Sequence, residues 1–129
     1  MRVNTGKMVR FYLDTYALVE IARANKIFIK YLKQEFVTSD ITLAEFYNIM
    51  LRDFNEQTAD FWFRKISPNS KSVGKELLID AVKFRRRNRP KNFSFFDAVG
   101  YVYAVKQGYG FLTGDKEFEG MQNVEFVKT

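Results

Sequence analysis

Short apolar runs and longer helical patterns succeed one another along most of the chain. Residues 9–13 are rich in strand-forming side chains and end at Asp14-Thr15, a pair that suits the N-terminus of a helix. Residues 16–20 and 26–35 then carry apolar side chains at helical spacing. A strand followed by helices is typical of α/β proteins, so we expect that fold class.

The remaining pattern extends this alternation to the end of the chain. We expect strands at 36–38, 109–113 and 124–127, helices at about 39–51, 57–66, 72–87 and 93–108, a loop at 67–70 and a single turn at 116–120. Crossover helices between the strands predict a parallel or mostly parallel sheet with helices on both faces.

The segment 93–105 is apolar, aromatic or small except for Ser94 and Asp97. A helix that is apolar on nearly every side lies inside a domain, where an ionised carboxylate needs a partner or a metal. One interpretation is that Ser94 and Asp97 form a capping box at the helix start. The other is that Asp97 belongs to a functional site, and the two interpretations are compatible.

Composition narrows the chemistry that this chain can perform. Its 129 residues are enough for one domain, and they include no cysteine and no histidine. Thiolate or imidazole zinc sites, cysteine nucleophiles and histidine-based triads are therefore excluded. An enzyme with this composition would depend on carboxylates, hydroxyls, lysines or a metal bound through oxygen.

The chain is basic, with 21 Lys and Arg residues against 15 Asp and Glu residues and a net charge of +6. This balance favours a polyanionic partner, first nucleic acid and second an anionic membrane. No apolar run approaches the roughly 20 residues of a membrane-spanning helix, so we expect a cytoplasmic protein. Residues 1–7 are polar and patternless and predict an extension outside a single domain at 8–129.

Four carboxylates lie where predicted strands end or predicted helices begin. Asp14 and Asp115 follow strands, whereas Glu45 and Asp97 fall in the first turns of helices. Ligands in open α/β sheets collect beyond the carboxyl ends of the strands, so we expect these acids to converge. Clustered carboxylates repel one another, and all-oxygen ligands select Mg²⁺ or Mn²⁺, which can activate water against a phosphodiester. For each single acid, a helix cap or a solvated charge remains the alternative.

Four segments together resemble the signature motifs of PIN-domain ribonucleases: FYLDT at 11–15, LAEF at 43–46, SFFDA at 94–98 and LTGDKEF at 112–118. The small single-domain form is similar to VapC-like toxins of toxin–antitoxin pairs. This resemblance implies a three-layer α/β/α sandwich and an endoribonuclease that depends on Mg²⁺ or Mn²⁺. It also implies a homodimer and an antitoxin that covers the cleft.

The same resemblance assigns roles to individual residues. It implies four metal ligands, direct or through water: Asp14, Glu45, Asp97 and Asp115. Thr113 would take a hydrogen-bonding role beside the last of these acids. Many relatives carry an aspartate where this chain has Glu117, which makes Glu117 a further candidate ligand.

A cluster of basic side chains precedes the segment that contains Asp97. Its members are Arg85, Arg86, Arg87, Arg89 and Lys91. We expect them to bind RNA phosphates beside the acids. The alternative is a solvated helix end whose cations complement the helix dipole.

Phe61, Trp62 and Phe63 are adjacent on a predicted helix, and three consecutive side chains cannot all face one core. We therefore expect at least one to lie on a dimer or antitoxin surface. Two rival functions stay open: a metal-free RNA-binding module of PIN-like fold, and a nuclease that uses the same acids on DNA. A small-phosphate hydrolase is less favoured, because the chain has no glycine-rich phosphate loop.

Overall fold

The computed structural model describes residues 10–128, so the expected extension at 1–7 and residues 8, 9 and 129 of the expected domain lie outside the described residues. The strands are β1 (Phe11–Leu13), β2 (Phe36–Ser39), β3 (Ser70–Lys71), β4 (Gly110–Thr113) and β5 (Val124–Phe126). The α-helices are α1 (Thr15–Ala22), α2 (Lys26–Ile29), α3 (Asp40–Asp53), α4 (Glu56–Ile66), α5 (Lys75–Arg87) and α6 (Phe95–Gln107). Three short 3₁₀ turns complete the chain: η1 (Lys30–Lys33), η2 (Ser67–Asn69) and η3 (Lys116–Phe118).

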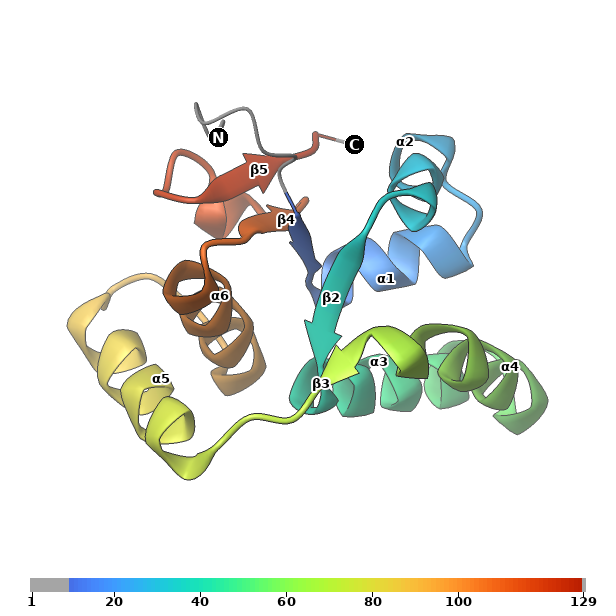
Figure 1. Ribbon diagram of the computed structural model, residues 1–129, viewed down its shortest axis with the longest axis horizontal. Helices are drawn as coiled ribbons and strands as arrows, with labels where there is room; N and C mark the ends of the chain where they lie inside the picture. Colours follow the sequence, from blue (N-terminus) through green and yellow to red (C-terminus); the bar gives the residue numbers. More distant parts are fainter. Residues whose placement is uncertain (1–9, 129) are drawn as a thin grey trace.

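The strands form a sheet in the order β3-β2-β1-β4-β5, and each neighbouring pair is parallel. The predicted parallel sheet is thus confirmed (Figure 1). The short edge strand β3 was not predicted. Its first residue is the last of a Ser-Pro-Asn-Ser segment that is typical of a loop, and its second residue follows that segment. Ser70 pairs with Thr38, and its hydroxyl donates to Asp40, which fixes this segment against the sheet.

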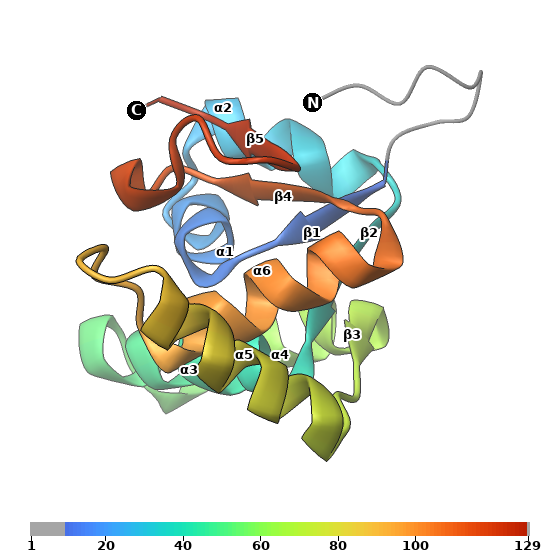
Figure 2. The same ribbon diagram turned by 90° about the vertical axis from the view of Figure 1, so that its left-hand side faces the viewer.

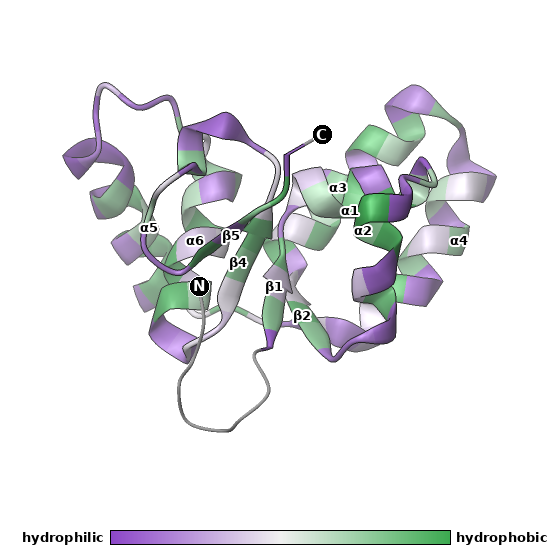
Figure 3. Cartoon of the chain, turned by 90° about the horizontal axis from the view of Figure 1, so that it is seen from above, coloured by the Kyte–Doolittle hydropathy of each residue, from purple (hydrophilic) through white to green (hydrophobic). Residues whose placement is uncertain are grey.

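Alternate side chains of the central strands enter two different cores. Leu13 and Leu112 pack with α1, α2, α3 and α4, whereas Tyr12 and Phe111 pack with α6. Figure 2 shows α6 between α5 and the strands β1 and β4, and Figure 1 shows α1 on the other side of the sheet. Figure 3 shows β4 as mostly hydrophobic, as expected of a strand buried on both faces. The expected α/β/α sandwich is therefore confirmed.

Two contacts fix the end of the sheet where the candidate acids lie. The pairing of Leu13 with Leu112 brings the carboxyl ends of β1 and β4 together, and the Asp14 N–H donates to the Leu112 carbonyl at 3.3 Å. On the other side of β1, the buried Tyr12 hydroxyl lies 2.7 Å from Ser39 Oγ and 2.8 Å from Thr42 Oγ1. These contacts set the start of α3 against β1.

Two predicted helices differ from those observed. The helix expected at 26–35 is divided into α2 and the turn η1, where the chain tightens and the Gln34 N–H bonds to the Tyr31 carbonyl. α5 begins at Lys75 rather than near 72, because Gly74 is still extended at its N-terminus. None of the helices between residues 10 and 128 is long and apolar enough to span a membrane.

Candidate metal centre

Asp14 is the most deeply buried acid of the predicted cluster, with 5% of its surface exposed. It follows β1 directly and caps α1, where its Oδ1 accepts a hydrogen bond of 2.8 Å from the Ala17 N–H. A hydrogen bond from the Thr113 hydroxyl reaches the same carboxylate from β4. The carboxylate is therefore held by one group from α1 and one from β4.

The pKa of Asp14 is raised from 3.8 to about 8, chiefly by burial. The negative charges of Asp97 and Asp115 contribute to this increase, whereas the hydrogen bonds from Thr113 and Ala17 oppose it. In the absence of a cation, the Asp14 carboxyl group is therefore mostly protonated at neutral pH. A bound cation would replace that proton.

Glu45 lies in the second turn of α3, which begins at Asp40, close to the start predicted from the sequence. Its Oε1 accepts a hydrogen bond from the Thr15 hydroxyl at the start of α1. Burial raises the pKa of Glu45, the Thr15 hydrogen bond lowers it, and the charge of Asp97 raises it. Glu45 is therefore within electrostatic reach of the cluster.

Asp97 forms the predicted capping box at the start of α6. Its Oδ2 accepts from the Ser94 N–H at 2.9 Å, and its own N–H donates to Ser94 Oγ at 3.0 Å. Burial nevertheless raises the pKa of Asp97, with a smaller increase from Asp115 and a decrease from the positive charge of Arg85. The capping-box interpretation of Asp97 is therefore confirmed, and its membership of a functional site stays a prediction.

The loop after β4 places Asp115 beside Asp14. The Asp115 N–H donates to Thr113 Oγ1 at 3.0 Å, so the Thr113 side chain contacts both acids. Gly114 between them is required by packing, since a Cβ there would lie 2.3 Å from the Tyr16 ring. The Glu117 N–H donates to Asp115 Oδ1 at 3.0 Å, and this contact orients the half-buried Glu117 next to the cluster.

The oxygen atoms of these side chains are the kind of ligand that a hard divalent cation prefers. All the side chains concerned offer oxygen. The charges of Asp97 and Asp115 raise the pKa values of neighbouring acids, and a cation would relieve this effect. Within residues 10–128, however, no three acidic side chains surround one point as ligands of a single ion. Direct binding of one cation by several of these acids would therefore require side-chain rotation.

A cavity of about 320 Å³ opens beside these acids, between α1 and α3. Thr15, Glu45 and Asp97 line it close to the sheet, and Arg23 and Arg52 line it at the other ends of the two helices. The sequence analysis did not identify these two arginines. The only signal was a basic residue near each helix end, which is too common to indicate a site.

The predicted basic cluster is divided by the structure. Arg85, Arg86, Arg89 and Lys91 line a second cavity, of about 530 Å³, whereas Arg87 does not line it. The Arg85 Nε donates to the Phe93 carbonyl at 2.7 Å, and Lys91 Nζ donates to the Glu117 carbonyl at 2.7 Å. Lys91 thus connects this basic cavity to the loop that carries Asp115.

A model of the PIN domain matches residues 11–123, and the chain therefore belongs to the PIN domain family. No individual curated protein matches the sequence. The fold is similar to that of VapC20 from Mycobacterium tuberculosis, described as a toxin that cleaves the sarcin-ricin loop. The TM-score is 0.74 at 18% identity, over 92% of this chain and 98% of that chain.

Two complexes contain chains of the same fold. In a toxin–antitoxin complex from Klebsiella pneumoniae, the TM-score is 0.72 at 17% identity, over 95% of this chain and 100% of that one. In VapBC2 from Rickettsia felis bound to a promoter DNA fragment, the TM-score is 0.70 at 12% identity, over 93% and 98%. At these identities the similarities establish the fold.

Asp14→Asn should change how the stability of the metal-free protein depends on pH. The wild-type carboxyl has a higher pKa when folded than its unfolded value of 3.8, so its contribution to stability is complete below about pH 4 and is lost as the pH rises to about 8. Asparagine cannot titrate. Between pH 5 and 7 the wild type should therefore lose about 1 kcal/mol per pH unit relative to the variant.

The measurement is urea unfolding in chelator at pH 5, 6, 7 and 8. Asp60→Asn, which removes a carboxylate from α4 outside the cluster, is the control and should follow the wild type. Parallel pH profiles for the wild type and Asp14→Asn would show that Asp14 has no raised pKa.

Proposed function

We propose that this chain is a Mg²⁺- or Mn²⁺-dependent endoribonuclease that acts in the cytoplasm as the toxin of a toxin–antitoxin pair. The observation that carries the proposal is the buried Asp14, whose pKa of about 8 is raised by burial and by the charges of Asp97 and Asp115. Perturbed carboxylates of this kind are typical of functional sites. Membership of the PIN domain family supports the same conclusion.

The metal would be held by four carboxylates, directly or through water, with Glu117 as a further candidate: Asp14, Glu45, Asp97 and Asp115. When bound, the ion supplies Lewis acidity toward the phosphate and lowers the pKa of water. The protein orients these acids. The Ala17 N–H holds Asp14, the capping box holds Asp97, and Thr113 joins Asp14 to Asp115.

RNA is the proposed substrate because the acids lie in a chain of net charge +6 and because positive side chains lie close to them. Arg85 is near enough to Asp97 to lower its pKa, and Lys91 is bonded to the Glu117 carbonyl. We propose that Arg85, Arg86, Arg89 and Lys91 contact RNA phosphates, and that Arg87 adds to the positive potential. The description of VapC20 as a toxin that cleaves the sarcin-ricin loop supports RNA over DNA.

An antitoxin is the proposed partner, and a homodimer the proposed state of the chain. Several of the similar structures are toxin–antitoxin complexes. A groove of about 630 Å³ between α3 and α4 is lined by Leu43, Tyr47 and Phe63, with the carboxylates of Asp40 and Asp60 beside them. We propose that it receives an antitoxin segment that carries apolar and basic side chains.

The nuclease activity is tested by incubating an end-labelled structured RNA with the purified protein in Mn²⁺, in Mg²⁺ and in chelator. Cleavage should require the metal and should fall by about 100-fold or more in Asp97→Asn, because the variant loses one negative ligand. Asn retains an acceptor for the Ser94 N–H, so the start of α6 should persist. Asp60→Asn is the matched control and should retain full activity.

Three results would contradict the proposal in different ways. Cleavage of DNA but not RNA would identify a DNA-directed nuclease. RNA binding without cleavage in any metal, in protein free of co-purified partner, would identify a non-catalytic RNA-binding module. Equal cleavage by the wild type and Asp97→Asn would exclude the carboxylate cluster as the active site.

The partner surface is tested with Phe61→Ser/Phe63→Ser, because these side chains are 51% and 44% exposed on α4. The variant should bind its antitoxin at least about 10-fold more weakly, as expected when two aromatic anchors are lost, and should keep its own oligomeric mass. Light scattering and titration calorimetry measure the two properties. Ile79→Ser, a 55% exposed position on α5, is the control. A loss of the dimer instead would assign this surface to self-association.

A further inference from the structure

Arg23 and Arg52 come together at the end of the candidate active-site cavity that is remote from the sheet. Arg23 caps the C-terminus of α1, and Arg52 lies in the last turn of α3. Both line the cavity that Glu45 and Asp97 line at its other end. α1 and α3 run side by side between two cross-links, one from Thr15 to Glu45 and one from Arg23 to Asp53.

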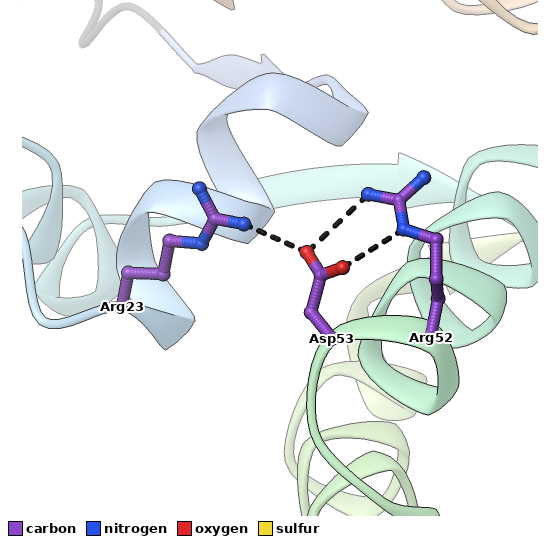
Figure 4. Close-up of polar contacts among 3 residues, drawn as sticks. All are labelled: Arg23, Arg52 and Asp53. Atoms are coloured by element: carbon purple, nitrogen blue, oxygen red, sulfur yellow. Dashed lines mark hydrogen bonds and ion pairs between the residues drawn. The ribbon is translucent and has the colours of Figure 1, made fainter.

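Asp53 holds the two guanidinium groups in a fixed arrangement (Figure 4). Its Oδ2 accepts from Arg23 Nη2 at 2.7 Å, and its two oxygens accept from Arg52 Nε at 2.8 Å and Arg52 Nη2 at 3.3 Å. The hydrogen bond from Arg52 lowers the pKa of Asp53, so the carboxylate stays ionised. Two positive groups around one negative group leave a local charge of +1.

Stability alone is a poor explanation for this arrangement. The side chains of Arg23 and Arg52 are 48% and 66% exposed, and exposed ion pairs contribute little to the free energy of folding. A guanidinium group has five N–H donors, so each arginine retains donors that Asp53 does not use. Such donors in a fixed planar fork match the oxygens of a phosphate group.

The wall between the two ends of the cavity is mostly apolar. Val19 from α1 and Ile49 from α3 line it, together with the half-buried Tyr16. Glu20, another acid that lines the cavity, accepts a hydrogen bond from the Asn25 side chain. From Glu45 to Arg52 the cavity follows α3 for about 10 Å, since a helix rises about 1.5 Å per residue. Because Asp53 holds both guanidinium groups at that far end, they are placed for a different phosphate from the one that the acids would cleave.

We propose that Arg23 and Arg52 form a subsite for a backbone phosphate of single-stranded RNA, separate from the phosphate that is cleaved. This proposal rests on the proposed ribonuclease function and adds a path for the substrate. The strand lies along the groove between α1 and α3, with its sugar and base against Val19 and Ile49. Asp53 orients the two arginines and does not contact the RNA.

The test measures binding of a fluorescent single-stranded RNA in the cleavage-deficient Asp97→Asn background, at several KCl concentrations and without divalent metal. Adding Arg23→Gln/Arg52→Gln should weaken binding about 10-fold or more at low salt. In this double variant, a plot of the logarithm of the RNA-binding constant against the logarithm of the KCl concentration should have a slope shallower by about 0.7. This change is expected when one phosphate contact to a single strand is lost. Arg64→Gln, which removes an exposed positive charge from α4, is the control and should change the affinity less than about 2-fold.

Arg23→Lys/Arg52→Lys separates charge from geometry and guards against misfolding. The lysine variant should show the same salt dependence of RNA binding as the Asp97→Asn parent. It should recover only part of the parent's RNA affinity, because lysine lacks the planar, forked guanidinium group. Thermal melting should show that both double variants fold. An affinity and slope for the Gln variant that equal those of Arg64→Gln would overturn the proposal.

Two outcomes distinguish this inference from the proposed function. If the parent binds RNA and the arginine pair has no effect, the subsite is wrong and the ribonuclease proposal stands. If the parent binds no RNA, the substrate path fails, and the cleavage assay decides whether the nuclease proposal fails with it.

Discussion

The placement of one buried carboxyl group, Asp14, among other acids is the constraint on which the rest of this structure depends. Asp14 is almost inaccessible to solvent, and the charges of Asp97 and Asp115 oppose its ionisation. A protein that evolves for stability alone gains nothing from this cluster, because a buried acid near two others is costly. The parallel pairing of β1 with β4 nevertheless brings Asp14 and Asp115 to one edge, and the capping box fixes Asp97 beside them. The fold keeps these acids together, and a bound cation would relieve the repulsion that arises when they ionise.

The candidate cleft is polar at its two ends and apolar between them. Acids lie where the sheet meets the starts of α1 and α3, and the pair of arginines lies where these helices end. A negative strand could not approach the acids without a cation, whereas it is attracted to the arginines without one. Metal binding and substrate binding would therefore depend on different ends of the same groove, and each end can be altered separately.

The sequence predicted the fold class, the parallel sheet and most helices, because strands buried on both faces and amphipathic helices leave clear patterns. It placed Asp14, Asp97 and Asp115 at element ends, and in the folded chain the charge of Asp115 raises the pKa values of Asp14 and Asp97. It could not identify Arg23 and Arg52, which are separated by 29 positions and meet only through packing of α1 on α3. The strand β3 was missed for a similar reason, since Ser70 and Lys71 have no strand pattern of their own and pair only because β2 lies beside them.

The most direct test of the metal centre is calorimetric titration of the purified protein with Mn²⁺ at pH 7, in buffers of different ionisation enthalpy. Because the pKa of Asp14 is about 8, the cation should displace nearly one proton for each ion bound. Asp14→Asn should bind more weakly and release no proton. Binding without proton release, or the same proton release from Asp14→Asn, would contradict the account of a protonated buried acid replaced by a metal.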